Sequence, residues 1–533
     1  MTLVRQRNLK NIRVASALAF FCLVTYLLAD PWRIVPPRAA EWLLAFQLGP
    51  ALSKAILYGG TAVAGLAVLA LLTLLFGRIY CSAVCPLGTL QDFFIRVAGR
   101  FRRLRRYKYR PPMFGLHYGL LLLTLLFLFL GSALIADLTE PYSVYAKITV
   151  QTLRPAFVLL VNGAASAAAF LHPGVVDAIP ARTVQVPAFL TALGLLTLIA
   201  ALSFSRGRLF CNTLCPAGAL LGIASRISLF RIVIGHDDCN GCGKCERTCK
   251  AECIDSPRQQ ISRAACVTCF DCIGNCPTEA ISFRSRFSRR RGEHHPSPAP
   301  PSRPEAGHAD RRAFLRRMGP PLAAWSLPSL LTWQKSGRKT DSYDAAKSVP
   351  VVPPGSQSIA RYTSLCTACH LCVSSCPTQV LQPAFLEFGI GGILQPKMDY
   401  SISYCNYDCT VCGSVCPTGA IAAMDIASKK LVQIGRASFV RDDCVVVSKK
   451  KDCAACSEHC PTKAVSTVPY EGSLMIPSLN NDICIGCGAC EHACPVTPRK
   501  AIYVAPNTVH QRAQKPPEQH NQSLPQGLKE FPF

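Results

Sequence analysis

The fold is decided by two cysteine motifs, CNGCGKCERTC at residues 239–249 and CVTCFDCIGNCP at residues 266–277. Each reads C-x2-C-x2-C-x3-C, a spacing that points three thiolates at one face of a cubane iron–sulfur cluster. In tandem motifs of this kind, the fourth cysteine crosses to the neighbouring cluster. We therefore predict two [4Fe–4S] sites, the first held by Cys239, Cys242, Cys245 and Cys276, and the second by Cys266, Cys269, Cys272 and Cys249.

The first motif departs from the second after its fourth cysteine. A proline, Pro277, follows the second motif, where it stops a helix and separates the two sites. The first motif has Lys250 there and an additional cysteine, Cys253, so Cys249 and Cys253 are alternative ligands. Zinc is the alternative chemistry, but zinc sites do not ordinarily need four evenly spaced cysteines in tandem.

A second cysteine-rich region follows at residues 366–494 and repeats the same spacing with small insertions. It predicts four further [4Fe–4S] sites and therefore about six clusters in the chain. We expect its first motif to pair with its fourth and its second with its third. The candidate ligands are Cys366, Cys369, Cys372, Cys376, Cys405, Cys409, Cys412, Cys416, Cys444, Cys453, Cys456, Cys460, Cys484, Cys487, Cys490 and Cys494.

One of these motifs also matches a haem attachment sequence. Cys366, Cys369 and His370 read C-x-x-C-H, which attaches c-type haem. Cys372 and Cys376 complete the ferredoxin spacing around it, and a haem would leave both without a role. The sequence therefore favours a cluster here.

The apolar first part of the chain contains an internal repeat. GRIYCSAVCPLG at residues 77–88 and GRLFCNTLCPAG at residues 207–218 each follow a long apolar run. Four thiolates complete a cluster, so Cys81, Cys85, Cys211 and Cys215 are a candidate metal centre. The alternatives are structural cysteine pairs or a redox dithiol. Cys22 stands alone in an apolar run and is read as a small hydrophobic residue.

Apolar runs predict a membrane α-helical bundle of about four transmembrane helices. The runs lie at residues 14–29, 55–76, 113–136 and 187–204. We read the first as an anchor rather than a signal peptide, because no small-residue cleavage site follows it. A basic N-terminus and the basic segment 96–110 both belong on the cytoplasmic side, which leaves the run 156–171 as non-spanning. His117 on the third run is a candidate quinone residue, or else a packing residue.

The formal net charge of +26 suggests a nucleic-acid partner at first sight. However, many basic residues flank apolar runs, most of the others lie in one linker, and no recognition motif accompanies them. We predict no nucleic-acid partner.

The linker is rich in Arg, Pro and Ser, a composition that predicts disorder. It ends in DRRAFLRRMG at residues 310–319, before the weakly apolar PPLAAWSLPSLLTW. This order is similar to a twin-arginine export signal, which is read by a receptor that exports folded cargo. The alternative is a basic juxtamembrane stretch with a short buried helix. Export would place the first ferredoxin unit in the cytoplasm and the second in the periplasm.

The predicted fold is thus a membrane bundle with two small α+β units of the bacterial-ferredoxin type. The expected divisions are a transmembrane domain at 1–230, a two-cluster ferredoxin domain at 231–285, a disordered linker at 286–310, a twin-arginine-like segment at 311–334, a linker at 335–360, a four-cluster domain at 361–505 and a disordered tail at 506–533.

Residues 1–285 resemble the membrane ferredoxins of the NapH, NosR and CcoG group, through the two G-R-x-aromatic-C-x3-C-P repeats and the motifs after them. Residues 311–504 resemble MauM/NapG-type polyferredoxins, through DRRAFLRRM, the PPG at 353–355, SYCNYDCTVCGSVCPTGAI and KDCAACSEHCP. The resemblance implies a protein of the bacterial inner membrane that oxidises quinol and delivers electrons to a periplasmic redox partner, a reductase or a cytochrome.

No Rossmann fingerprint, P-loop or flavin-attachment motif is visible in the sequence. A row of clusters without a catalytic pocket is a wire for single electrons. The leading hypothesis is an electron conduit with quinone as substrate. The alternatives are a CcoG-like copper reductase or cofactor-assembly factor, and a redox-sensing membrane scaffold.

Overall fold

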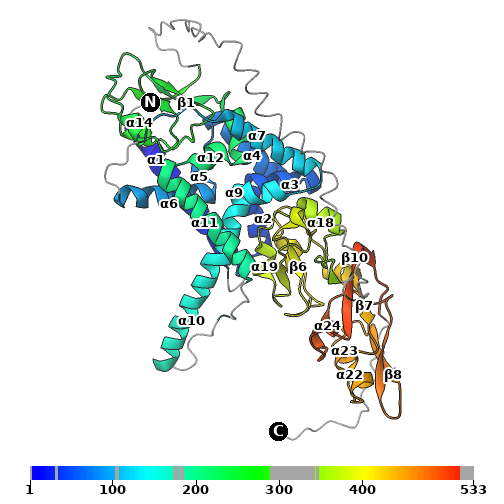
Figure 1. The fold of residues 1–533 in the computed structure, drawn as a ribbon. Helices are drawn as coiled ribbons and strands as arrows, with labels where there is room; N and C mark the ends of the chain where they lie inside the picture. Colours follow the sequence, from blue (N-terminus) through cyan, green and yellow to red (C-terminus); the bar gives the residue numbers. More distant parts are fainter. Residues whose placement is uncertain are drawn as a thin grey trace, which may run out of the picture. The chain divides into compact units, whose positions relative to one another are not determined.

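The computed structural model describes residues 3–30, 34–101, 107–171, 179, 185–287, 343 and 347–516 (Figure 1). Residues Met1–Ser285 and Ser348–Phe533 group into one compact unit. The twin-arginine-like segment, and the predicted disordered linker beyond residue 287, lie outside the described residues.

The first part of the chain is helical. Its elements are α1 (Leu3–Ala29), α2 (Pro37–Ala45), α3 (Leu48–Tyr58), α4 (Thr61–Phe76), α5 (Tyr80–Ala83), α6 (Pro86–Phe101), α7 (Phe114–Phe129), α8 (Leu134–Thr139), α9 (Pro141–Ile148), a π-helical turn (Thr149–Leu153), α10 (Arg154–Leu171), α11 (Val186–Arg206), α12 (Leu209–Thr213) and α13 (Pro216–Ser225). We call residues 3–229 the helical domain.

The helix lengths differ from the predicted spans. Within the described residues, three helices are long and apolar enough to cross a membrane: Asn8–Ala29, Pro141–Ala167 and Val186–Arg206. The predicted span at 55–76 is divided, because Gly59 and Gly60 both take positive φ angles, 68° and 65°, between α3 and α4. The run 156–171, predicted to form no span, belongs to the long helix Pro141–Ala167, and whether it spans stays a prediction.

Several helices carry leucine side chains that face outward. Leu71 on α4 is 56% exposed, Leu122 on α7 is 69% exposed and Leu159 on α10 is 71% exposed. Water does not favour so much exposed apolar surface on a folded domain, whereas lipid does. The helical domain therefore has surfaces suited to a membrane.

The first ferredoxin domain, residues 230–285, is built on two small antiparallel sheets. Strand β1 (Phe230–Ile234) pairs with β4 (Ile281–Ser285), and β2 (Ile254–Asp255) pairs with β3 (Gln260–Ile261). The short helices α14 (Lys244–Thr248) and α15 (Asp271–Gly274) follow the two cysteine loops. The ring of Phe76, at the end of α4, stacks on Phe230 with centroids 5.7 Å apart, so the domain packs against that end of α4.

The second ferredoxin domain, residues 348–516, contains three two-stranded antiparallel sheets. Its sheets pair β5 (Leu381–Pro383) with β6 (Pro396–Met398), β7 (Val432–Phe439) with β10 (Ile502–Arg512), and β8 (Val465–Pro469) with β9 (Met475–Leu479). Its helices are α18 (Ile359–Leu365), α19 (Leu371–Ser375), a 3-10 turn (Ile390–Gly392), α20 (Val411–Val415), α21 (Ile426–Lys429), α22 (Val445–Ser448), α23 (Ala455–Glu458) and α24 (Ala489–Ala493).

Two predicted boundaries of this domain were wrong. The linker predicted at 335–360 is folded from residue 350 on: Val352 is buried, and Met398 donates a backbone hydrogen bond to Val351. The disordered tail predicted from residue 506 was wrong for its first residues, because β10 continues to Arg512 and pairs with β7. Polar residues such as Asn507 and Gln511 hid this strand, since an edge strand needs no apolar face.

Candidate functional site

The cysteines of the first ferredoxin domain form two groups. At site A, burial raises the pKa of Cys245, and the neighbouring thiols of Cys239 and Cys276 raise it further; Cys242 lies in the same loop. At site B, burial raises the pKa of Cys272, and Cys269, Cys266 and Cys249 raise it further. The fourth cysteine of each motif thus lies with the other motif, as the tandem spacing predicts.

The second ferredoxin domain has four such groups, and the cysteines in each are those that act electrostatically on one another. They are site C (Cys366, Cys369, Cys372 and Cys416), site D (Cys376, Cys405, Cys409 and Cys412), site E (Cys460, Cys484, Cys487 and Cys490) and site F (Cys444, Cys453, Cys456 and Cys494).

The predicted pairing of motifs in this domain was wrong. The first motif exchanges its fourth cysteine with the second motif, and the third exchanges with the fourth. Short strands close each pair: β5 and β6 lie within the first pair, and β8 and β9 within the second. Pairing of neighbours in sequence needs only short loop closures, which cost less entropy than the nested arrangement that we expected.

The loops curl because of left-handed backbone on both sides of the second cysteine. In the motif at 366–376, Ala368 has φ 44° and His370 has φ 61°. Gly486 and Gly488 hold the same two places in the last motif, with φ angles of 73° and 81°. Left-handed residues reverse the chain, so that thiols from a short loop turn toward one point. A short helix then ends at the fourth cysteine.

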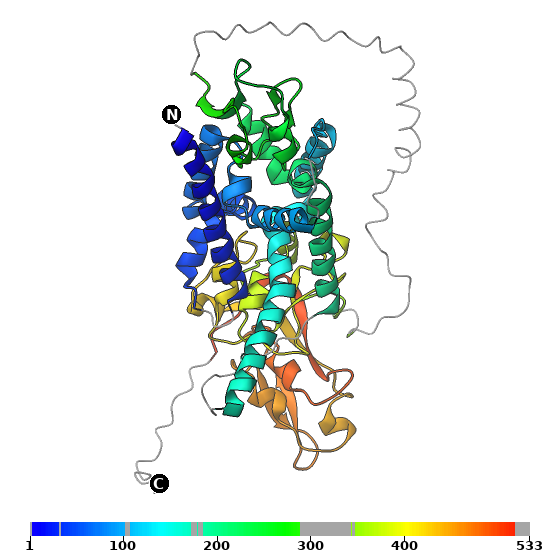
Figure 2. The same cartoon turned by 90° about the vertical axis from the view of Figure 1, so that its left-hand side faces the viewer.

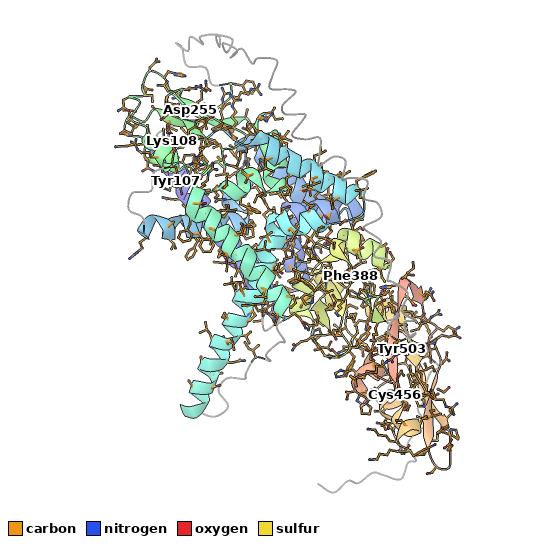
Figure 3. All side chains as sticks on the ribbon, in the orientation of Figure 1. Tyr107, Lys108, Asp255, Phe388, Cys456 and Tyr503 are labelled. Atoms are coloured by element: carbon orange, nitrogen blue, oxygen red, sulfur yellow. The ribbon has the colours of Figure 1, made fainter. Side chains whose placement is uncertain are left out.

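The donor sets fit cubane clusters better than single ions. At site F, Cys444, Cys453, Cys456 and Cys494 line one cavity (Cys456 is labelled in Figure 3). Over the described part of the chain, no three Cys, His or acidic side chains stand close enough to hold a single metal ion. A zinc ion needs its four ligands at one point, whereas a cubane spreads its four thiolates over its corners.

The histidine of the haem-like motif is already engaged. His370 is 1% exposed, its Nδ1 lies 2.9 Å from Gln151 Nε2 and its Nε2 lies 2.9 Å from the carbonyl of Leu394. Both ring nitrogens therefore have partners, and neither is free to act as an axial haem ligand. Gln151 belongs to the helical domain, so the contact joins that domain to site C.

The four cysteines of the internal repeat come together in the helical domain; we call Cys81, Cys85, Cys211 and Cys215 the quartet. All four are buried. Burial raises the pKa of Cys85, and the thiols of Cys211 and Cys81 raise it further. The two halves of the repeat thus build one site, which neither half forms alone.

Two arginines cross between the halves of the repeat. Arg78 Nη2 donates to the carbonyl of Cys211 at 2.8 Å, and Arg208 Nη1 donates to the carbonyl of Cys81 at 2.6 Å. Each guanidinium also lies near the sulfur of its own repeat, 3.9 Å from Cys81 and 4.0 Å from Cys211. Neither arginine side chain is exposed.

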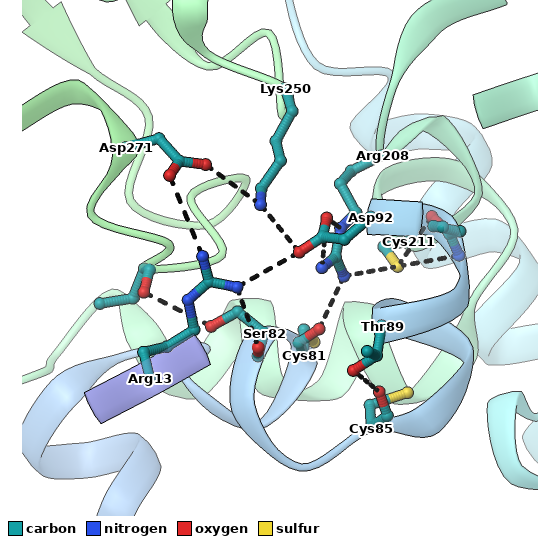
Figure 4. Close-up of polar contacts among 12 residues, drawn as sticks. Arg13, Cys81, Ser82, Cys85, Thr89, Asp92, Arg208, Cys211, Lys250 and Asp271 are labelled. Carbon is teal, nitrogen blue, oxygen red and sulfur yellow. Dashed lines mark hydrogen bonds and ion pairs between the residues drawn. The ribbon is translucent and has the colours of Figure 1, made fainter. Parts of the chain in front are cut away.

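A buried ion network joins the quartet to the first ferredoxin domain (Figure 4). Asp92 on α6 accepts from Arg208 Nε at 2.9 Å, Lys250 at 2.8 Å and Arg13 at 3.2 Å. Lys250 also lies 3.2 Å from Asp271. Burial opposes ionisation, but the charges of Arg208 and Lys250 hold the pKa of Asp92 well below its usual range. Lys250 stands where the second motif has Pro277, and its ion pair with Asp92 ties the first ferredoxin domain to α6.

The sites follow one another along a continuous buried core. Members of site B, the quartet and site C share it, namely Cys249, Cys269, Cys81, Cys85, Cys211, Cys215 and Cys369. Tyr80 lies within electrostatic range of Cys85, and Tyr142 within range of Cys369. Beyond site C, the backbone N–H of Cys405 in site D donates to the carbonyl of Cys487 in site E at 2.9 Å. The spatial order is A, B, quartet, C, D, E, F.

Three weaker candidates have definite surroundings. His117 is buried, with Nε2 3.0 Å from the carbonyl of Cys215, so it lies beside the quartet. Cys22 is exposed on α1. Cys249 and Cys253 lie with their sulfurs 3.5 Å apart, and Cys253 also contacts Cys266. The choice between Cys249 and Cys253 as ligand, and a quinone role for His117, stay predictions.

Sequence reasoning missed the charged side chains around the quartet. Arg78 and Arg208 stand at the same place in both halves of the repeat, and this recurrence was the available signal. Asp92 and Gln151 gave no such signal in the sequence, because each meets its partner only in the folded chain.

Comparison with known families gives two domain matches. A 4Fe-4S binding domain family matches residues 58–106 and 188–235, the two halves that carry the quartet. A 4Fe-4S dicluster domain family matches residues 365–420 and 428–512, which are the two motif pairs of the second ferredoxin domain.

Among curated proteins, an uncharacterized protein of Methanocaldococcus jannaschii is 34% identical over 106 residues, 20% of this chain and 42% of that protein. The putative electron transport protein YccM of Escherichia coli is 27% identical over 212 residues, 39% of this chain and 50% of YccM. The ferredoxin-type protein NapG of Escherichia coli is 29% identical over 209 residues, 37% of this chain and 85% of NapG. The chain thus spans half or less of the length of the first and second of these relatives. No solved structure matches.

These findings identify an iron–sulfur electron-transfer protein with 4Fe–4S ferredoxin domains, homologous to the Nap ferredoxin-type proteins.

Proposed function

We propose that this protein conducts electrons across the bacterial inner membrane, from membrane quinol to a redox partner on the periplasmic side. The supporting observation is that the two ferredoxin domains pack at opposite ends of the same helices, with the quartet buried between them. The chain would hold about six [4Fe–4S] clusters at sites A to F.

The ends of α1 support this arrangement. Near its N-terminus, Lys10 lies 3.0 Å from Asp271 of the first ferredoxin domain. Its other end contacts α19 of the second ferredoxin domain (Figure 2). At 27 residues, α1 is about 40 Å long, enough to cross a hydrocarbon core of about 30 Å.

Helices α3 and α4 also have one ferredoxin domain at each end. Phe76, at the end of α4, stacks on the first ferredoxin domain. Tyr58, at the end of α3 next to the start of α4, donates to the carbonyl of Gly419 in the second ferredoxin domain at 3.1 Å. The 16 residues of α4 correspond to about 24 Å.

Positive charge sets the direction. The basic N-terminus and the segment 96–110 belong on the cytoplasmic side, and Tyr107 donates to Arg247 of the first ferredoxin domain (Tyr107 and Lys108 in Figure 3). The first ferredoxin domain is therefore cytoplasmic and the second periplasmic. Spans at α1, α4, α7 and α11 bring both ends of the helical domain inside. The long helix Pro141–Ala167 is then a packed helix rather than a span, because more of it is buried within the protein than of the other two long helices. Export by DRRAFLRRM would account for the connection between the domains.

Each cluster would supply the chemistry of accepting and returning a single electron. The chain holds the clusters in a row and excludes water between them. Buried side chains such as Tyr80 and Tyr142 fill the space between the quartet and site C. Site F lies at the far end, where an acceptor could dock.

Reconstitution of the full chain in liposomes tests the conduit. With a menaquinol analogue in the lipid and a membrane-impermeant acceptor outside, we expect quinol-dependent reduction of the acceptor. Cys453→Ser at site F should abolish it, whereas Cys22→Ser should leave it unchanged. Copper reduction without reaction with quinol would favour the metal reductase. No flux with full cluster content would favour the redox-sensing scaffold.

A reporter fused after residue 345 tests the topology. We expect periplasmic reporter activity that is lost when Arg311 and Arg312 are replaced by lysine. A cytoplasmic signal from the unmodified chain would contradict the proposed export.

A further inference from the structure

The second ferredoxin domain contains a groove that takes no part in the proposed conduit. Its volume is about 890 Å³, a size typical of small-molecule sites, and it lies among β7, α21, the end of β10 and the loop of site D. We propose that it binds a planar aromatic anion and that the bound charge lowers the reduction potential of the cluster at site D. The effect on the potential rests on the proposed clusters, whereas the binding itself does not.

One wall of the groove is an irregular stretch of β10. The register of this strand against β7 shifts between Pro506 and Gln511. Within the bulge, the backbone N–H of His510 donates to the carbonyl of Gln357 at 2.8 Å. Gln357 has a φ angle of 66°, which residues with a side chain rarely adopt. Bulges and left-handed residues recur at binding sites, and here both border the same groove.

Tyr407 supplies an aromatic wall and belongs to the loop of site D. It lies two residues from Cys405 and two from Cys409, both proposed ligands of that site. The gap between these cysteines is one residue longer than the matching gap in the first and last motifs of the domain. Leu431 and Val432 add apolar surface to the groove. A flat ring bound there therefore packs beside the cluster loop of site D.

The charge of the groove is positive. Lys430, Arg512 and Lys515 line it, and no acidic residue among the described ones does. Lys430 is paired with Asp408 at 2.6 Å, and the buried Lys429 donates to carbonyls of the cysteine loop, where it faces the cluster at site D. Arg512 and Lys515 are exposed and form no ion pair within the described residues. These two cations are additional to those that serve site D, and they favour an anionic ligand.

His510 adds a polar group that the described chain does not use. Both nitrogens of its ring are buried and have no hydrogen-bond partner within the described residues. Burial lowers the pKa of the ring to about 4, so the ring is neutral at physiological pH and carries one N–H. Buried polar groups ordinarily have a partner. An acceptor oxygen of a bound anion would satisfy this N–H.

Titration calorimetry on the full chain, purified anaerobically in detergent, tests the binding with naphthalene-2,6-disulfonate. This probe is flat, anionic at both ends and not itself reduced by the clusters. We expect saturable binding, and far weaker binding of inorganic sulfate or of the uncharged naphthalene-2,6-dimethanol. Sulfate bound as tightly would refute the aromatic part of the proposal, and dimethanol bound as tightly would refute the role of charge. Binding that appears only when the chain is ended after Pro516 would assign the groove to the last segment of the chain itself and overturn the proposal.

Variants of the groove locate the bound probe. Arg512→Gln/Lys515→Gln should weaken binding about tenfold, through the loss of two exposed ion pairs. The control Lys449→Gln/Lys451→Gln removes the same charge from exposed lysines near site F and should bind as the wild type does. Ala427→Trp fills the groove without a change in charge and should block binding. Wild-type iron content shows that each variant folds, and unchanged affinity in Ala427→Trp or in the first double variant would overturn the proposal.

A redox titration followed by electron paramagnetic resonance tests the coupling to site D. The signal of site D is the one that Cys376→Ser removes. Saturating probe should shift the potential of this signal to a more negative value, because a nearby negative charge disfavours reduction, and Arg512→Gln/Lys515→Gln should remove the shift. Binding without a shift would refute the coupling. The measurement needs no quinol, so a shift in a chain that carries no quinol-dependent flux would refute the conduit alone.

Discussion

The ion network at Asp92 predicts how firmly the first ferredoxin domain is docked. Asp92→Asn keeps the shape of the side chain but removes the charge that three cations share, with nitrogen–oxygen distances of 2.8–3.2 Å. Removal of one partner from a buried ion pair destabilises by about 3–5 kcal/mol, because the remaining charges stay buried. We expect the equilibrium for opening this interface to rise more than about a hundredfold.

Hydrogen exchange measures that opening directly. The backbone N–H of Arg208 donates to the carbonyl of Lys250 at 2.8 Å across the interface, so its exchange reports undocking. In Asp92→Asn this amide should exchange more than about a hundredfold faster. Asp425→Asn is the matched control, because Asp425 is exposed and caps only the short helix α21. Unchanged exchange at Arg208 in a folded Asp92→Asn chain would refute the reasoning.

The effect should also have a definite pH dependence. The pKa of Asp92 is lowered in the folded chain, so its stabilising charge is fully present above the unfolded pKa of about 3.9 and is lost as pH falls through the lower folded value. The difference between wild type and Asp92→Asn should therefore be constant from about pH 6 to 8 and shrink only in acid.

Three further predictions test other parts of the molecule. Cys376→Ser should remove the cluster at site D and spare site C, because Cys376 crosses to the neighbouring motif; Mössbauer or paramagnetic resonance spectra that lose site C would contradict the pairing. Gly88→Ala should lower the melting temperature and cost about 1–3 kcal/mol, because a Cβ there would lie 2.3 Å from a backbone carbonyl; Gly99→Ala on the same helix meets open space and should have no effect on melting. Arg361→Met should speed hydrogen exchange in α18, because the guanidinium donates to Tyr58 OH at 2.7 Å and to the part-buried carbonyls of Gly419 and Ala420 at 3.0 Å each, and a buried acceptor left unpaired costs about 1–3 kcal/mol; exchange equal to wild type would show that the contact does not hold the domain.

The sequence was informative where the chemistry is local. A loop of C-x2-C-x2-C folds by its own backbone, so the cysteines of site A and site B could be grouped from spacing alone. The repeat of the quartet could also be read, because both halves carry the same residues. Its arginines had no predicted role, since each bonds across to the other half.

Pairing between motifs was harder to predict, because identical motifs offer several combinations of similar local quality. In the predicted nested arrangement, the first motif pairs with the fourth and the second with the third. In the observed sequential arrangement, the first pairs with the second and the third with the fourth. Both use the same cysteine loops. Only the short strands between neighbouring motifs separate them: β5 and β6 close the first pair within about 15 residues, and this hairpin signal was overlooked. Strand β10 was missed for a related reason, as its second half is polar and pairs at an edge.

The two ferredoxin domains contact the helical domain through different kinds of side chains. The first ferredoxin domain docks through buried charges from both partners, such as Lys250 against Asp92. Such an interface suits a domain that follows the helical domain directly in the chain and folds against it. The second domain docks through contacts such as His370 against Gln151 and Arg361 against Tyr58 OH.

Charges near that second interface are already paired within the helical domain. Lys147 forms its ion pair with Asp137, and both side chains are buried. A domain that folds separately and arrives later would then bury no charge that lacks a partner, and would lose little by being exposed before docking. Such docking would suit the proposed export of a cluster-loaded domain. Exchange of the Gln151–His370 pair for an ion pair, as in Gln151→Glu, should impair assembly of the second domain more than its own cluster content. Equal loss of both would argue that the two domains fold together.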